Sequence, residues 1–110
     1  MATFEEFQRI DIRVGTVTKA EPFPAAKKPA IKMEIDFGPE LGTKRSSAQL
    51  TVHYEPEALV GRQVVAVVNF PVRRIATFDS EVLVLGAMPQ ATEVILLGVD
   101  QRVENGTRIG

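Results

Sequence analysis

Apolar and polar side chains alternate along much of this chain, and the alternation predicts a series of short strands. The clearest case is AIKMEIDFG (residues 30–38), where apolar residues occupy every second position from Ile31 to Phe37. Successive side chains of a β-strand point to opposite faces of a sheet, so this segment predicts a strand with one buried face. The residues from Ile10 to Gly15 alternate in the same way, and Gly15 is expected to mark a β-bulge.

Four apolar segments in the second half of the chain predict further strands. They are SSAQLTV (46–52), QVVAVVNF (63–70), EVLVLGA (81–87) and EVILLGV (93–99). In the first of them, alternation places Ala48, Leu50 and Val52 inward. The second is almost continuously apolar, which is typical of a central strand, and Phe70 at its end is expected in the core.

A short helix is predicted at the start of the chain. Thr3 followed by Glu6 fits a capping box. Phe4, Phe7 and Ile10 then recur at intervals of three and form an apolar stripe. Because two turns of helix cannot bury such a stripe alone, we expect it to pack on the domain or on a second subunit.

The order of the predicted elements indicates an all-β domain. PEALVG (56–61) predicts a one-turn helix, with proline suited to its first position and glycine to its end. Three strands, a short helix and two more strands form the order of the OB-fold, a five-stranded Greek-key barrel. We therefore predict one OB-fold domain over residues 1–110. Residues 1–10 and 92–110 would be an N-terminal helix and a C-terminal β extension, both expected to serve in dimerisation.

Composition narrows the class of protein. Hydrophobic residues make up 45% and charged residues 25% of the 110 residues, an ordinary globular balance. The absence of cysteine excludes disulfides and thiolate metal sites. The N-terminus does not have the pattern of a signal peptide, and no apolar stretch is long enough to span a membrane. We expect a cytoplasmic protein whose small core would gain stability from dimerisation.

The net charge of −1 is unlike that of a general polyanion binder, so the distribution of charge matters more. Three dibasic pairs occur, namely Lys27-Lys28, Lys44-Arg45 and Arg73-Arg74. An OB-fold binds ligands across its second and third strands, between the loops after strands one and four. The first and third pairs fall on those two loops. The second pair lies toward the other end of the barrel and is expected to contribute less to ligand binding. The alternative is that each pair only makes a loop soluble.

Aromatic and polar residues accompany the two basic loops. Phe23 and Phe78 lie on them, and if exposed they would stack on a base or hold an apolar side chain. The alternative is that they plug the ends of the barrel. The outward side chains predicted for the face between the loops are polar: Arg13, Lys32, Glu34, Ser47 and Gln49.

No catalytic or metal centre is predicted. His53 is the only histidine, and its place before a helix favours a structural role. Asp79, Ser80 and Glu81 place a serine between carboxylates, but no base accompanies them, and a turn is the better interpretation. No glycine-rich phosphate loop or metal-ligand spacing occurs. We predict a binding protein that is not an enzyme and needs no cofactor.

Several segments together resemble a known family. They are FEEFQRIDIRVGTVTKAE (4–21), PAIKMEIDFG (29–38), SSAQLT (46–51), NFPVRRIATFDSEVLVLG (69–86) and NGTRIG (105–110). They are similar to the CsaA family of export-related, chaperone-like proteins, which is grouped with the tRNA-binding domains appended to methionyl-tRNA synthetases. The chain departs from the broader tRNA-binding group at its third strand, where Ala48-Gln49-Leu50-Thr51 replaces a Ser-Gly-Ile-Ala stretch. It departs again at Ala76-Thr77, which replaces a Met-Gly element, and at Val82, while Ser80 is retained.

The resemblance implies a homodimer that binds unfolded or precursor polypeptides in a hydrophobic pocket of each subunit and is linked to protein export. Phe4, Phe7 and Ile10 would lie at the dimer interface. The alternative is structure-specific tRNA binding on the same OB-fold face, and a third possibility is a module that only docks onto another protein. The residues predicted to bind peptide or tRNA are Phe23, Lys27, Lys28, Lys32, Ser47, Gln49, Arg73, Arg74, Phe78 and Ser80.

Overall fold

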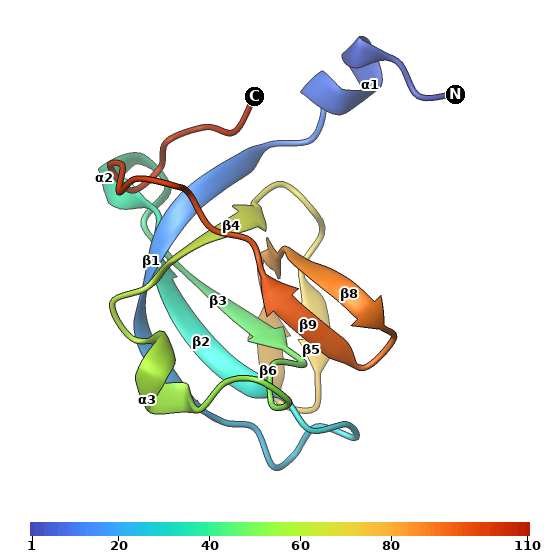
Figure 1. Ribbon diagram of the computed structural model, residues 1–110, viewed down its shortest axis with the longest axis vertical. Coiled ribbons are helices and arrows are strands. Elements are labelled where there is room, and N and C mark those ends of the chain that lie inside the picture. Colours follow the sequence, from blue (N-terminus) through green and yellow to red (C-terminus); the bar gives the residue numbers. More distant parts are fainter.

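Five antiparallel strands form one curved sheet in the computed structural model, which describes residues 1–110 (Figure 1). The order across the sheet is β3-β2-β1-β4-β7. The strands are β1 (Ile12–Pro22), β2 (Ile31–Asp36), β3 (Thr43–Ala48), β4 (Gln63–Val67) and β7 (Leu83–Val84). The two edges meet where the Glu81 N–H donates to the Arg45 carbonyl at 2.8 Å and the Ser46 hydroxyl donates to the Val82 carbonyl at 2.9 Å. The sheet is therefore a nearly closed barrel with the predicted OB-fold order.

Three short helices connect or precede the strands. They are α1 (Phe4–Gln8), α2 (Gly38–Leu41) and α3 (Pro56–Leu59). The predicted capping box of α1 is present, because the Glu6 N–H donates to Thr3 Oγ1 and the Thr3 N–H donates to Glu6 Oε1. Helix α3 lies between β3 and β4, as predicted, and Pro56 begins it. None of the three has the length and apolar composition needed to cross a membrane.

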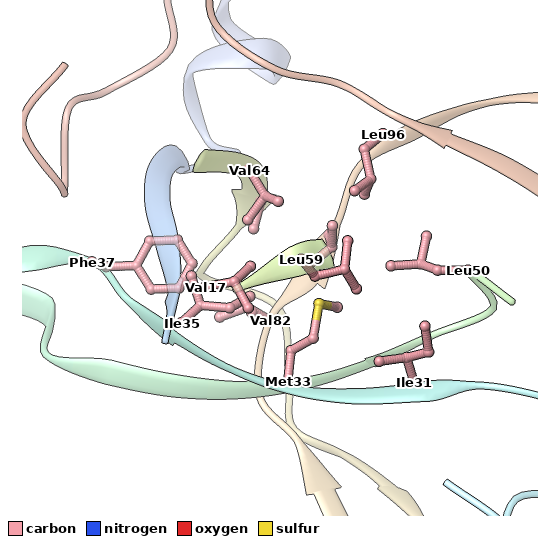
Figure 2. Packing of buried hydrophobic residues seen from close by; sticks show 12 residues of the cluster. Val17, Ile31, Met33, Ile35, Phe37, Leu50, Leu59, Val64, Val82 and Leu96 are labelled. Carbon is pink, nitrogen blue, oxygen red and sulfur yellow. The ribbon is translucent and has the colours of Figure 1, made fainter. Parts of the chain in front are cut away.

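The barrel is filled by apolar side chains that point inward from the strands and from α3 (Figure 2). The alternation predicted for β2 is confirmed, since Ile31, Met33, Ile35 and Phe37 are all buried. Leu59 of α3 is also completely buried, and Figure 2 shows it in the middle of the cluster. The short helix therefore supplies a core residue and closes one end of the barrel.

Gly15 has a different role from the one predicted. The irregularity in the pairing of β1 with β2 lies between Val17 and Lys19, so the prediction of a bulge at Gly15 is wrong. A Cβ atom at Gly15 would lie 2.7 Å from Ile35 Cγ2 and 2.8 Å from the Phe37 ring. Gly15 is needed because large side chains of the core occupy the space where its own side chain would be.

Two residues that were expected inside the barrel lie at the surface. Strand β3 ends at Ala48, and the chain then turns so that Leu50 is buried but Val52 is exposed. Strand β4 ends at Val67, and Asn69 fixes the departing chain by accepting from the Asp11 N–H and donating to the Arg9 carbonyl. Phe70 follows this turn and is 46% exposed. Both predictions failed because a strand was extended beyond its end, by alternation at Val52 and by a continuous apolar run at Phe70.

The C-terminal part of the chain is a hairpin followed by a tail. Strands β8 (Gly86–Gln90) and β9 (Glu93–Leu96) form a separate two-stranded sheet beside the barrel (Figure 1). The hairpin is attached through Leu96, which is buried and whose N–H donates to the Tyr54 hydroxyl at 3.0 Å. The predicted C-terminal β extension is thus present.

The tail, residues 97–110, returns along the start of β1. The Gly106 N–H donates to the Val14 carbonyl at 2.7 Å, and the Val14 N–H donates to the Thr107 carbonyl at 2.9 Å. Gly106 has a φ of +92°, and a Cβ atom there would lie 2.5 Å from the Phe37 carbonyl oxygen. The turn at Asn105-Gly106 is therefore the point at which the tail is fixed to the barrel.

Candidate ligand-binding cleft

The segment that carries Arg73, Arg74 and Phe78 is a hairpin rather than a loop. Strand β5 (Arg73–Ile75) pairs with β6 (Phe78–Ser80), with Arg74 opposite Asp79. Ala76 begins the tight turn between them with a φ of +53°. The predictions of an irregular loop here and of a turn at Asp79 are both wrong. Cross-strand pairs stabilise the hairpin, and the Arg74 Nη1 group donates to Asp79 Oδ1 at 2.7 Å.

This hairpin forms one wall of a cleft of about 560 Å³. The other walls are the loop after β1 and the end of β3. The lining residues are Ala25, Ala26, Lys27, Lys28, Ala30, Ser47, Ala48, Gln49, Arg73, Arg74, Ile75 and Ala76. Six of the ten side chains predicted to bind a ligand therefore meet around one cavity: Lys27, Lys28, Ser47, Gln49, Arg73 and Arg74. The walls are otherwise small and apolar.

Phe23 and Phe78 lie beside the cleft and contact each other. Their ring centroids are 5.4 Å apart in an edge-to-face arrangement. Phe23 is only 5% exposed and Phe78 is half-buried. The Lys32 ammonium lies 5.3 Å from the Phe23 centroid and 5.7 Å from that of Phe78, and the Arg45 guanidinium lies 5.5 Å from that of Phe78. The sequence left open whether these rings are exposed for stacking or plug an end of the barrel, and the burial of Phe23 favours the plug. Two cations cover this aromatic plug.

Three of the six cations on this face are paired with carboxylates. Lys32 lies 3.3 Å from Glu21, and Arg45 lies 3.6 Å from Glu81. Arg74 is held by Asp79, and this hydrogen bond is the main reason why the pKa of the Asp79 carboxyl is lowered. In contrast, the side chains of Lys27, Lys28 and Arg73 have no carboxylate within 4.0 Å and make no hydrogen bond. The free positive charge of the cleft therefore comes from these three residues.

Three other polar residues have surroundings that differ from the prediction. Arg13 is not on the binding face, because its guanidinium donates to Asp11 at 2.6 Å and to the Gly106 carbonyl at 3.0 Å, under the tail. Ser80 is buried and its hydroxyl accepts from the Ser47 N–H, so it joins β6 to β3. Arg45 was expected to contribute little, yet it covers Phe78.

The remaining candidates for chemistry are isolated. His53 lies 2.7 Å from Glu93 and joins the segment before α3 to β9. No group of three or more histidine, aspartate or glutamate side chains gathers so that it could hold a metal ion.

The barrel and its short N-terminal helix define an OB-fold domain, and sequence comparison identifies its family. Residues 12–108 match the family described as "Putative tRNA binding domain", and the chain belongs to this family. Methionine–tRNA ligase of Methanococcoides burtonii is 34% identical over 109 residues, and that of Porphyromonas gingivalis (strain ATCC 33277) is 42% identical over 84 residues. These matches cover 99% and 76% of this chain but only 16% and 12% of the ligases.

Three solved structures are similar to this chain over all or nearly all of their own length. Chaperone CsaA of Bacillus anthracis is 58% identical with a TM-score of 0.96, and covers 100% of this chain and 99% of its own. The CsaA chaperone protein of Picrophilus torridus is 45% identical with a TM-score of 0.92, and both chains are covered completely. A methionyl-tRNA synthetase related protein of Pyrococcus horikoshii is 27% identical with a TM-score of 0.87, covering 100% of this chain and 98% of its own.

Proposed function

We propose that this protein is a chaperone-like binding protein, not an enzyme, that holds exposed segments of unfolded or precursor polypeptides in the cleft. The observation that carries the proposal is its similarity, over the whole chain, to two proteins described as CsaA chaperones. Clients that are precursors of exported proteins would connect this protein with export. It would meet such clients in the cytoplasm.

The cleft suits an extended peptide in size and chemistry. Its volume of about 560 Å³ lies within the range of small-molecule sites, roughly 300–1,000 Å³, so it accommodates a few residues of a client. Alanine side chains and Ile75 supply apolar contact, while Ser47 and Gln49 offer polar groups to a peptide backbone. Because apolar contact is not directional, we expect weak binding of many different clients.

A titration with an unfolded client protein, at low and at physiological salt, tests this function. Ala25 lies on the cleft wall and is exposed, so Ala25→Trp fills the cleft without disturbing the core. We expect client binding that persists at physiological salt, and about tenfold weaker binding by Ala25→Trp if it removes about 1.4 kcal/mol of contact. Ala58→Trp, on the exposed side of α3, is the matched control.

Two results would contradict the proposal. One is an absence of client binding by the wild-type protein at micromolar concentration. The other is equal client affinity of Ala25→Trp and wild type, which would place the client outside the cleft. Failure to bind either a client or tRNA would favour a module that only docks onto another protein.

A homodimer is part of the proposal, because two apolar surfaces have no partner within the chain. Helix α1 has no buried residue, and Phe4 is 71% exposed (Figure 1 shows α1 standing clear of the barrel). The β8–β9 hairpin and the residue after it add Met88, Ile95 and Leu97 as exposed apolar side chains. A second subunit that covers these surfaces would use the elements predicted for dimerisation, including Phe7 and Ile10.

The variants Phe4→Glu and Phe7→Glu are expected to be monomers. Each change places a charge in the proposed interface, where burial without a partner is costly. Light scattering coupled to size exclusion measures the mass, and circular dichroism should show an intact barrel because α1 contributes nothing to the core. Gln8→Glu on the same helix is the control and should stay dimeric. A dimeric mass for both phenylalanine variants, or a monomeric wild type, would refute this interface.

A second candidate function is structure-specific tRNA binding on the same face. It is favoured by the family match over residues 12–108 and by the three free cations around the cleft. Binding to phosphates weakens steeply with salt because counterions are released, whereas apolar capture of a peptide depends little on salt. The salt dependence of each titration therefore distinguishes the two functions.

A further inference from the structure

The carboxylate of Asp79 stands between two arginines beside the cleft. Its Oδ1 atom accepts from Arg74 Nη1 at 2.7 Å, and its Oδ2 atom lies 3.9 Å from Arg45 Nη2. Glu81 adds a second carboxylate near Arg45, at 3.6 Å from Nε. The side chain of Arg73, next to Arg74 in sequence and also on the cleft wall, has no such partner. Two adjacent arginines therefore differ in how available they are to a ligand.

The arrangement is built into the secondary structure. Arg74 and Asp79 are directly opposite each other in the β5–β6 hairpin, and Arg45 comes from β3. The position of Arg45 is fixed by its backbone, since its N–H donates to Glu81 Oε1 at 3.0 Å and its carbonyl accepts from the Glu81 N–H at 2.8 Å. The pairing with Asp79 thus follows from the register of the hairpin and from the closure of the barrel.

We propose that Asp79 is a specificity-determining residue that pairs with Arg74 and, together with Glu81, with Arg45. A bound ligand then meets only Lys27, Lys28 and Arg73 as free cations. The inference rests on the proposed function, because it takes the cleft to be the ligand site. A polyphosphate ligand would have to displace the protein's own carboxylate to reach the two paired arginines. A polypeptide with few charges has no need of them. Asp79 therefore shifts the selectivity of the cleft from nucleic acid toward polypeptide.

Counterion release sets how much the loss of the Asp79 charge should change the salt dependence of tRNA binding. Each phosphate neutralised on a nucleic acid contributes roughly 0.7–0.9 to the slope of log K against log salt concentration. Without the Asp79 charge Arg74 is released, while Arg45 keeps Glu81 as a partner at 3.6 Å. One released arginine would steepen the slope by about 1. Exposed ion pairs are individually weak, so Asp79 limits binding to phosphates rather than abolishing it.

The test compares the binding of unfractionated tRNA by wild type and by Asp79→Asn over a range of salt. We expect Asp79→Asn to bind tRNA about five- to tenfold more tightly at 0.1 M salt, with the steeper slope given above. Asp79→Glu, which keeps the charge, should stay near wild type. The double variant Asp79→Asn with Arg74→Ala should lose most of the gain. Asp100→Asn makes the same change of net charge in the tail, outside the cleft, and should leave the slope unchanged.

A matched pair of single variants tests the same idea without changing Asp79. Arg73→Ala should reduce the magnitude of the salt slope by about 1, while Arg74→Ala should reduce it by clearly less. Equal losses for the two variants would overturn the inference, as would a wild-type slope for a folded Asp79→Asn. These results are separable from the proposed function, because client binding is measured in parallel. A steeper tRNA slope for Asp79→Asn in a protein that binds no client would refute the chaperone function and retain the role of Asp79.

Discussion

Replacing Gly106 with alanine is expected to detach the C-terminal tail and to lower the free energy of unfolding by about 2–5 kcal/mol. The positive φ of +92° costs a residue with a side chain about 1–2 kcal/mol. The new methyl group would also lie 2.5 Å from the Phe37 carbonyl oxygen, in a place where both partners are backbone. Such overpacking costs about 1–3 kcal/mol further. Urea denaturation measures the loss.

Hydrogen exchange gives the local result of the same substitution. The Val14 N–H, which donates to the Thr107 carbonyl, should exchange faster once the tail is released. Gly61→Ala is the matched control, because Gly61 has a φ of +90° but open space where the methyl group would go. Gly61→Ala should lose only the roughly 1–2 kcal/mol of unfolding free energy that a positive φ costs a residue with a side chain. Equal losses of stability in the two variants would mean that the contact with Phe37 does not matter.

Removing the three free cations of the cleft is expected to abolish most of the affinity of this protein for tRNA. In a triple variant with alanine at Lys27, Lys28 and Arg73, the salt slope should become shallower by about 2 to 3. At 50 mM salt this corresponds to a loss of about a hundredfold or more in affinity. Client binding should change much less, because a client with few charges depends on the apolar walls. Fluorescence anisotropy with labelled tRNA measures both the affinity and the slope.

A second triple variant separates the position of the charges from their number. Alanine at Arg9, Lys19 and Lys44 removes the same charge from outside the cleft lining. It should keep most of the tRNA affinity and of the slope. If the two triple variants lose affinity equally, the attraction is a general effect of net charge, and the cleft is not the tRNA site.

The sequence contained enough information to predict the barrel, because alternation is strong wherever a strand is half-buried. Ile31 to Phe37 face the core as predicted, and α3 lies where the OB-fold order requires it. Neither alternation nor a continuous apolar run shows where a strand stops. Val52 and Phe70 were therefore assigned to the core, although turns fixed by backbone and side-chain hydrogen bonds expose them.

The site was predicted in part, and the part that failed depends on pairing between distant segments. The two dibasic segments meet at one cleft, as the OB-fold order predicted, with Lys27 and Arg73 both on its walls. The role of Arg45 and Asp79 was missed because no local pattern shows which segment closes the barrel against β3. Their proximity to each other depends on the hydrogen bonds of Glu81 across that closure.

Both termini lie beyond the same end of the barrel, with the loop after β1 and the turn of the β5–β6 hairpin at the other end (Figure 1). The tail produces this arrangement, because it carries the C-terminus back along β1 toward α1. A polypeptide joined to either terminus would therefore extend away from the cleft and leave it open. This geometry makes the domain transferable: it suits a small independent protein and equally an appendix to a much larger enzyme, such as the ligases that contain a related segment.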